Sequence, residues 1–563
     1  MKKNNNSISK EARRFVLISA IILVFLGLLV RLVYIQIVNY SKISRDVSST
    51  VNKQSEEQAK RGDILDSSGK VLAESLQKYD LSIDPNFIRE RRIYDDVKAV
   101  LAQNGIRVPK ANIKDYGNTS FVWLASGLSE ETAANIRKSQ GAAGIILKPR
   151  FIRQYPEGVF LTHILGRVGA DSKGLNGMEF VFNSELSGEI IKIKQYRDGR
   201  GRLLNEGFID KSEKKGHNLT LTIDRNIQFI VEQEMDLAFK KNRAKRAVCI
   251  VQRPKTGEIL AMAVLPEYSL SDKIADIDIL KNFAVSDIFE PGSTFKIVAL
   301  AAAIEEKKIT AQDKFYLEDG KYKIADRIIS DDHIIMGFAT VEKIMEQSSN
   351  IGFIKIAYKL GENIFYNYIR KFGFFSITGI ELQGESRGML ADASQWNALS
   401  LPNISFGQGI GVTALQIIGA FSAIANDGIL MQPLIVKQIG DNIKDYKPKI
   451  VRRVVSADTA KEVKRILKAV VEKGTGQSAK VSQYTVGGKT GTAQKINTHT
   501  KEYSKYNYIA SFCGMLPAME PEIVILIVFD EPRGDYYAAS IAAPVFSKIA
   551  KRTAEYLKIP KDK

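Results

Sequence analysis

Residues 290–300 read Glu290-Pro-Gly-Ser293-Thr-Phe-Lys296-Ile-Val-Ala-Leu300, a Pro-Gly turn that leads into an apolar run. This order predicts a helix that begins at the serine. Ser293 and Lys296 are three residues apart, so on a helix their side chains lie on one face. A serine hydroxyl becomes a nucleophile when a base takes its proton, and a lysine can serve where burial and neighbouring positive charge lower its pKa. Alone, this pair is more often a capping serine beside a solvated lysine.

Two further motifs follow in the chain. Ser348-Ser-Asn350 offers a hydroxyl and an amide in a predicted helical region, and Gly487-Gly-Lys489-Thr490-Gly491-Thr492 puts a lysine among small residues on a predicted strand. The glycines suit a strand that lets a substrate backbone approach closely. In this order, Ser-x-x-Lys, Ser-x-Asn and Lys-Thr-Gly are the motif set of penicillin-binding proteins and class A β-lactamases.

Other chemistries fit the sequence poorly. Gly488-Lys489-Thr490 ends like a phosphate-binding loop, but the first glycine of that motif would fall at Gln483. No histidine base and no nucleophile elbow accompany Ser293, which disfavours a Ser-His-Asp triad. None of the four histidines has a partner at metal-ligand spacing. We therefore expect neither a metal nor another cofactor.

Composition sets broad limits. The chain has 563 residues, which predicts an anchor or tail plus two or more domains. The formal charge of +18 predicts attraction to anionic surfaces. Charge alone does not distinguish nucleic acid, acidic lipid and acidic polymers as the partner. Cys249 and Cys513 are far apart in apolar runs, which favours two buried thiols over a single disulfide.

The N-terminus predicts a membrane anchor over residues 15–38. The run is apolar apart from Arg31 and long enough to span a bilayer. Basic residues in the preceding tail, residues 1–14, predict that this tail stays in the cytoplasm and that the bulk of the chain is extracytoplasmic. A cleaved signal peptide and a buried core helix are the alternatives, but no small-residue cleavage site follows the run.

The remainder predicts two α+β domains. Residues 39–215 form a stalk and a pedestal, with a helical stalk expected over 41–60. Residues 216–563 form the second domain, in which strands at 248–252, 259–263, 485–493, 509–515 and 523–529 enclose a mostly helical middle. This pattern predicts an antiparallel sheet flanked by helices with an inserted helical subdomain. The polar stretch 495–506 predicts a mobile loop at the rim of the site.

From the anchor to about Lys551, the sequence resembles the class B penicillin-binding proteins. Beyond the three motifs, the resemblance includes the pedestal opening that begins at Arg61 and the segments around Arg153, Gly177, Thr256, Phe406 and Ala542. Asn350 favours the cell-division branch, because elongation-type relatives generally carry aspartate there. Ser67 and Arg253 depart from the usual pattern without touching a catalytic position.

The resemblance implies a membrane-bound D,D-transpeptidase with a β-lactamase-like catalytic domain, which crosslinks stem peptides ending in D-Ala-D-Ala and is inhibited by β-lactams. It implies Ser293 as acyl carrier, Lys296 as its base, Ser348 as proton shuttle and Asn350 as a guide for the donor peptide. Lys489 and Thr490 would hold the terminal carboxylate. Gly491 would complete that subsite, and the N–H groups of Ser293 and Thr492 would form the oxyanion hole.

The family resemblance also implies a glycosyltransferase of the SEDS family and other division proteins as partners, and no nucleic acid. Four alternatives stay open: an elongation-type transpeptidase, a D,D-carboxypeptidase, a β-lactamase-like hydrolase and a non-catalytic scaffold of the division machinery. The pedestal disfavours a simple hydrolase, and the intact motif set disfavours a silent scaffold.

Overall fold

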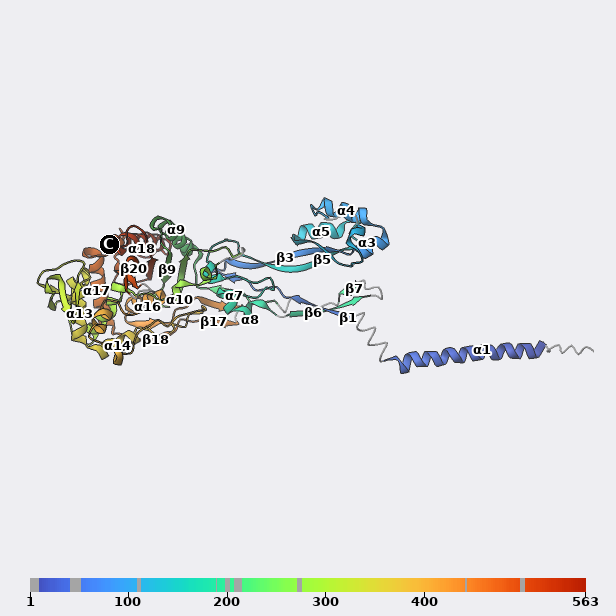
Figure 1. The fold of residues 1–563 in the computed structure, drawn as a ribbon, viewed down its shortest axis with the longest axis horizontal. Coiled ribbons are helices and arrows are strands. Elements are labelled where there is room, and N and C mark those ends of the chain that lie inside the picture. The colour runs from blue at the N-terminus through green and yellow to red at the C-terminus, as the bar shows by residue number, and fades with distance from the viewer. Residues whose placement is uncertain are drawn as a thin grey trace, which may run out of the picture. The chain divides into compact units, whose positions relative to one another are not determined.

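The structure is a computed structural model that describes residues 10–40, 52–108, 113–188, 190–197, 203–206, 215–270, 276–440, 443–496 and 502–563. The chain divides into two compact units. One comprises residues 1–59 and 189–215, and the other comprises residues 60–188 and 216–563. Figure 1 shows the elements coloured along the chain.

The first unit contains the apolar N-terminal helix and a small sheet. Helix α1 (Lys10–Val33) continues into a π-helical turn at Tyr34–Val38, and Ala12–Val38 is long and apolar enough to cross a membrane. Strand β1 (Asn52–Gln58) pairs with β6 (Ile190–Arg197), which pairs with β7 (Leu203–Glu206). The helical stalk expected over 41–60 is therefore wrong from Asn52 onward, because this segment has a distant strand partner; residues 41–51 lie outside the described residues.

The second unit begins with the pedestal. In the pedestal, helices cover one face of three paired strands. Strand β3 (Val71–Ile83) lies between β4 (Val122–Leu128) and β5 (Ile145–Gln154). Alternate residues such as Leu81 and Ile83 are buried against the helices. Those helices are α3 (Pro85–Arg91), α4 (Tyr94–Gln103) and α5 (Glu130–Lys138).

The pedestal contains a buried network of charged side chains around Glu179. Glu179 on helix α7 (Gly177–Val181) is fully buried and accepts hydrogen bonds from Nε of Arg61 and Nε of Arg153, both at 2.6 Å. Arg61 also donates to the Glu179 carbonyl, and Arg153 donates to the Gly62 carbonyl. Because each charge is both paired and hydrogen-bonded, this network can exist in the interior.

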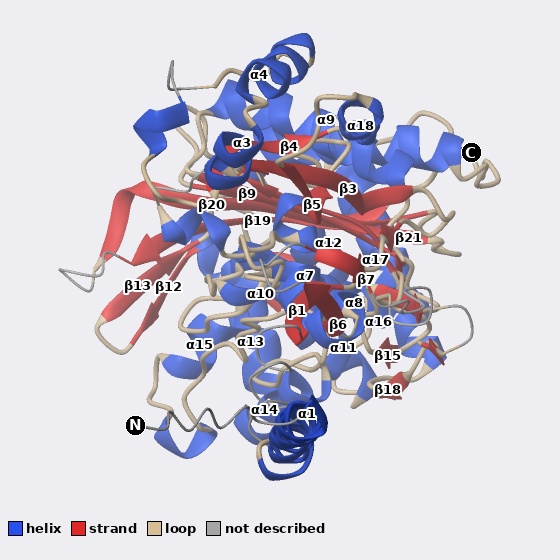
Figure 2. Cartoon of the chain, turned by 90° about the vertical axis from the view of Figure 1, so that its right-hand side faces the viewer, coloured by secondary structure: helices blue, strands red, loops and turns tan. Residues whose placement is uncertain are grey.

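The rest of the second unit is built on a five-stranded sheet in the order β10-β9-β21-β20-β19. Figure 2 labels β9, β19, β20 and β21 of this sheet. All neighbouring strands are antiparallel. The last strand in the sequence is thus the central strand, as Val524 of β21 pairs with Gln252 of β9. The bounds are β9 (Arg246–Gln252), β10 (Ile259–Leu265), β19 (Gly487–Ile496), β20 (Tyr503–Leu516) and β21 (Ile523–Asp530).

Helices cover both faces of this sheet. One face packs on α9 (Arg225–Asn242) and α18 (Ala538–Tyr556) through Cys249 and Phe512. The opposite face, which includes Ile250 and Leu526, packs on α11 (Lys296–Glu305), α16 (Ala414–Ala425) and α17 (Ala457–Lys473). Alternate residues of β9 therefore serve different cores, as the two-residue period of a strand requires. Both cysteines are buried free thiols, which confirms that expectation.

The segment between β10 and β19 supplies most of the remaining helices. It contains α12 (Val341–Glu346), α13 (Asn350–Leu360), α14 (Glu362–Lys371) and α15 (Ser400–Ser405). Three short two-stranded sheets lie in the same segment: β11 (Lys314–Tyr316) with β14 (Phe338–Thr340), β12 (Lys321–Ile324) with β13 (Arg327–Ser330), and β15 (Ile429–Met431) with β18 (Ile450–Arg453). The predicted α+β class, with a helical insertion in an antiparallel sheet, is confirmed.

Candidate active site

Ser293 lies on a tight turn that precedes the helix. Gly292–Phe295 form a 3-10 turn, and α11 begins only at Lys296, whose backbone N–H donates to the Ser293 carbonyl. In a 3-10 turn residues three apart are nearly eclipsed, so the serine and the lysine still share one face. Gly292 has a φ of +55° and its N–H donates to the Gly407 carbonyl at 3.1 Å, which fixes the turn from the opposite side.

Lys296 is fully buried and hydrogen-bonded to the second motif. Its ammonium group donates to the Ser348 carbonyl at 2.7 Å, to Ser348 Oγ at 3.2 Å and to Asn350 Oδ1 at 2.7 Å. Burial lowers the pKa of Lys296 to about 7, although the carboxylates of Asp331 and Asp332 raise it. Burial therefore favours the neutral form of Lys296, which is the form that can act as a base.

The second motif lies where helix α13 begins. Ser348 has a φ of +59°, a conformation that L-residues rarely adopt and that here turns the chain into the helix. Ser349 then caps α13 by accepting from Gly352 N at 2.9 Å. Because the cap belongs to Ser349, the side chains of Ser348 and Asn350 are available for the lysine on α11.

The third motif occupies the edge strand β19. Lys489 is fully buried and donates to Ser348 Oγ at 2.8 Å and to the Thr490 carbonyl at 3.2 Å. Burial, together with repulsion from Lys296, holds the pKa of Lys489 well below its usual value. Burial is thus the leading cause of the lowered pKa for both lysines, and repulsion between them adds to it at Lys489.

Small residues bring β19 close to the nucleophile turn. A Cβ on Gly491 would lie 2.8 Å from the Pro291 carbonyl oxygen, and a Cβ on Gly292 would lie 3.2 Å from the Thr492 carbonyl oxygen. Thr492 therefore lies beside the turn that carries Ser293. The structure brings all three motifs into one site, with Ser348 Oγ between the two buried lysines.

Sequence reasoning missed Asp331, which orders the second motif. This buried aspartate accepts from Ser349 Oγ and from Asn350 N, both at 2.5 Å, and from Ile351 N at 3.1 Å. A carboxylate at the start of α13 also interacts favourably with the helix dipole. Asp331 comes directly after β13, the second strand of the β12–β13 hairpin, and no spacing rule in the sequence singled it out.

Two other contributors were also missed. Thr475 accepts a hydrogen bond from Thr490 Oγ1 at 3.1 Å, in the loop after α17. Tyr508 on β20 stacks on Tyr536 with ring centroids 4.0 Å apart, just before Ala538, whose N–H donates to Thr492 Oγ1 at 3.2 Å. These aromatic rings lie close to β19 because the strand order brings them there, and no local motif marks them.

The expected loop at 495–506 is shorter than predicted. Strand β19 continues to Ile496 and β20 begins at Tyr503, because Lys495 pairs with Asp530 at 2.7 Å and with Glu531 at 2.6 Å. Residues 497–501, the centre of the expected loop, lie outside the described residues.

A five-stranded sheet between helical layers, a serine on the turn before a helix and two buried lysines that share Ser348 Oγ are together typical of serine acyl-transfer enzymes that use lysine in place of histidine. Within the described ranges, no group of three or more His, Cys, Asp and Glu side chains is arranged to hold a metal ion.

Comparisons with known proteins agree with this class. Residues 247–551 match the penicillin binding protein transpeptidase domain, and residues 56–221 match the penicillin-binding protein dimerisation domain. The chain is 33% identical to stage V sporulation protein D of Bacillus subtilis, over 98% of this chain and 86% of that protein. It is 32% identical to peptidoglycan D,D-transpeptidase FtsI of Buchnera aphidicola, over 98% and 96%.

Solved structures give the same result. The aztreonam complex of penicillin binding protein 3 from Mycobacterium tuberculosis matches with a TM-score of 0.70 and 28% identity, over 90% of this chain and 98% of that chain. Penicillin binding protein 2X from Streptococcus thermophilus matches with a TM-score of 0.79 and 26% identity, over 89% and 80%. The chain belongs to the class B penicillin-binding proteins, and the expected enzyme class is confirmed.

Proposed function

We propose that this protein is a peptidoglycan D,D-transpeptidase of cell division and that Ser293 carries the acyl group. The observation that supports these roles most directly is the position of Ser348 Oγ, which accepts from Lys296 Nζ at 3.2 Å and from Lys489 Nζ at 2.8 Å. One hydroxyl between two lysines of lowered pKa is a path along which a proton can pass.

In the first half-reaction, Ser293 Oγ attacks the carbonyl carbon of the penultimate D-Ala of a stem peptide. Neutral Lys296 takes the hydroxyl proton, and the backbone N–H groups of Ser293 and Thr492 stabilise the oxyanion. Ser348 passes a proton to the leaving amine as the amide bond breaks. The products are an ester on Ser293 and free D-Ala.

In the second half-reaction, an amine from a neighbouring strand attacks that ester. The amine loses a proton, Ser293 recovers one, and a new amide replaces the bond that was broken. Because the cleaved amide supplies the driving force, this exchange needs no nucleotide and suits an extracytoplasmic enzyme.

Lys489 and Thr490 would receive the terminal carboxylate of the donor peptide, and Gly491 leaves room for its backbone. An arriving carboxylate raises the pKa of a nearby lysine. Since repulsion between the two lysines disfavours a second charge, substrate binding would place the proton on Lys489 and leave Lys296 neutral. Asn350, whose Oδ1 accepts from Lys296, would align both the base and the donor peptide.

The cellular role rests on the relatives and on the anchor. We propose that the 12–38 helix holds the protein in the bacterial cytoplasmic membrane with its N-terminus inside and the pedestal and catalytic domain outside. A SEDS-family glycosyltransferase that makes the glycan strands would be its partner. Depletion should give filaments with unfinished septa. Round cells would indicate elongation instead, and a defect confined to spores would fit the name of the Bacillus relative.

Intact-mass spectra test the catalytic proposal. The full chain treated with one equivalent of a penicillin should carry one drug adduct that lasts many minutes and maps to the peptide containing Ser293. A transpeptidase protects its ester from water, because hydrolysis would waste the acyl group. Loss of the adduct within seconds with turnover of the drug would indicate a β-lactamase, and a folded protein without any adduct would indicate a scaffold.

A further inference from the structure

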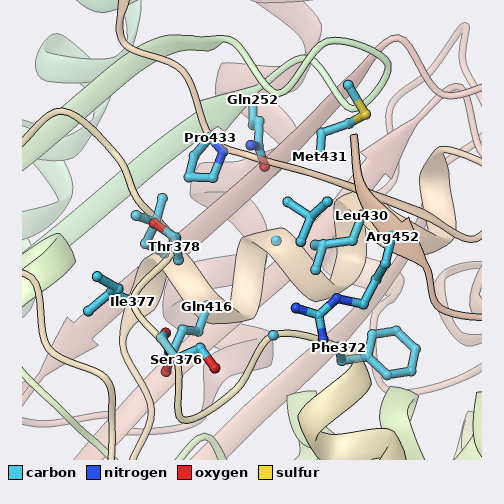
Figure 3. Close-up of a pocket in the computed structure, with 14 residues that line it drawn as sticks. Gln252, Phe372, Ser376, Ile377, Thr378, Gln416, Leu430, Met431, Pro433 and Arg452 are labelled. Carbon is cyan, nitrogen blue, oxygen red and sulfur yellow. Dashed lines mark hydrogen bonds between the residues drawn. The ribbon is translucent and has the colours of Figure 1, made fainter. Parts of the chain in front are cut away.

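A second hollow is lined by residues that lie outside the three motifs (Figure 3). Its free space is about 480 Å³ when the open solvent at its mouth is counted. Its floor is the first half of α16, with Leu415 and Gly419, and its roof is the β15–β18 pair, with Leu430 and Val451. The end of α14, at Phe372, and residues 376–378 complete the wall.

The pocket is lined mainly by carbon, and its free space has a structural cause. Gly419 faces the pocket without a side chain, and a Cβ there would meet only Leu430, at 3.9 Å. The amide group of Gln416 is occupied, because its nitrogen donates to the carbonyls of Ser376 and Arg387 and its oxygen accepts from Thr413 N. Most of the lining therefore offers an apolar surface, which favours an apolar body in the ligand.

One charged side chain, the exposed Arg452, contributes to the lining of this pocket. Arg452 on β18 reaches towards Phe372 (Figure 3), and its recorded hydrogen bond is one long contact of 3.4 Å to the Arg370 carbonyl. Among the described residues it has no carboxylate within 4.0 Å. Arg370 and Lys371, at the end of α14, are exposed beside it and add positive charge. A guanidinium in this setting favours an anionic group on the ligand.

The walls of the pocket also contact both flanks of the nucleophile turn. Between Phe372 and Ser376, the buried ring of Phe374 packs edge-on against Phe295, with centroids 5.1 Å apart. Phe295 lies between Ser293 and Lys296 in the chain. At the floor, the cap of α16, Thr413, follows Val412, which exchanges two 2.9 Å backbone hydrogen bonds with Phe289.

We propose that this pocket is a ligand site for a small apolar molecule with one anionic group, and that its occupant changes the reactivity of Ser293. The apolar body fills the space above Gly419, and the anion pairs with Arg452. Ordering of the 372–378 segment and of the start of α16 then reaches the Ser293 turn through Phe374 and Val412. The site is separate from the stem-peptide site, so it goes beyond the proposed function.

Binding is tested on the full chain in lipid nanodiscs with 1-naphthoate as the probe and 1-naphthalenemethanol as its neutral analogue, after subtraction of binding to empty nanodiscs. We expect saturable one-to-one binding of 1-naphthoate. Arg452→Gln should weaken 1-naphthoate about tenfold, the effect of losing one charge-assisted hydrogen bond, and leave the neutral analogue unchanged. Gly419→Leu should abolish binding of both.

Arg453→Gln is the matched control, because this neighbour on β18 lies outside the pocket lining and donates to the Asp427 carbonyl at 2.7 Å. Equal losses in the Arg452 and Arg453 variants would show a diffuse charge effect and overturn the site. Unchanged binding in Gly419→Leu would overturn it as well. Each variant is checked for folding by stoichiometric labelling with fluorescent penicillin.

Coupling is tested by the rate of that labelling. Saturating 1-naphthoate should change the acylation rate of the wild type at least twofold and leave the rate of Gly419→Leu unchanged. Equal rates with and without bound 1-naphthoate in the wild type would refute the link to Ser293.

Discussion

The acylation rate should depend on pH through Lys296. Lysine is a base only when neutral, so the rate of acylation by a β-lactam should rise with pH and level off above the pKa of Lys296. Burial lowers that pKa to about 7. The neutral fraction is then about one-eleventh at pH 6 and about ten-elevenths at pH 8, so the rate should rise about tenfold between them and hardly at all beyond pH 9.

A lysine of ordinary pKa would behave differently. With a pKa near 10.5 the neutral fraction would rise about a hundredfold from pH 6 to pH 8 and would continue to rise beyond pH 9. Stopped-flow acylation with a fluorescent penicillin, over pH 5.5 to 9.5, distinguishes the two curves. A profile without a plateau would refute the assignment of Lys296 as a base neutralised by burial.

Asp331 provides a second perturbation of the same curve. Its carboxylate raises the pKa of Lys296, so Asp331→Asn should move the midpoint to lower pH. The variant should also acylate more slowly at the plateau, because Ser349 and Asn350 lose a charged acceptor. Asp332→Asn is the matched control: this exposed neighbour has a smaller effect on the same pKa, and its midpoint should move less. A midpoint that moves upward in Asp331→Asn would contradict the electrostatic account.

Three further outcomes follow from the geometry. Ser293→Ala should abolish labelling by penicillin while costing about 1 kcal/mol of stability, a typical loss for a point substitution, and a labelled, folded variant would exclude Ser293 as nucleophile. Gly407→Ala should impair acylation, because φ is +85° and the added Cβ would lie 2.1 Å from the Gly292 carbonyl oxygen. Gly384→Ala is the control: φ is +76°, the added Cβ would meet open space, and the variant should lose only about 1–2 kcal/mol of stability. Glu179→Gln should lower the unfolding free energy by about 3–5 kcal/mol, because it leaves two guanidinium groups buried without a counter-charge. Glu157→Gln, which breaks a partly exposed pair, should cost less than about 1 kcal/mol in the same urea titration, and equal losses would refute the burial argument.

Local patterns predicted the parts of the fold that depend on nearby residues. The strands around Ile250 and Ile525 were predicted from their apolar runs, and the structure places β9 and β21 there. The helical stalk was wrong, because β1 is stabilised by β6, whose residues come more than a hundred positions later. A polar segment does not reveal such a partner.

The residues of the candidate site also fall into those that local sequence could predict and those that it could not. The three motifs contain residues whose chemistry is recognisable at short spacing, and the structure brings Lys296, Ser348 and Lys489 together. Asp331 accepts hydrogen bonds from Ser349, Asn350 and Ile351, and Thr475 accepts one from Thr490. Their contribution depends on tertiary geometry, so no spacing rule could identify them.

The strand order of the catalytic sheet has a consequence for biosynthesis. In the sheet, β21 lies between β9 and β20. Because β21 is the last strand in the sequence, β9 cannot pair with it until almost the whole chain has been synthesised. Until then, the apolar strands β9 and β10 have an unpaired edge in a nascent chain, which is the kind of surface that aggregates or recruits chaperones. A ribosome stalled before residue 523 should therefore hold a catalytic domain that protease digests readily, and resistance should appear only once β21 has emerged.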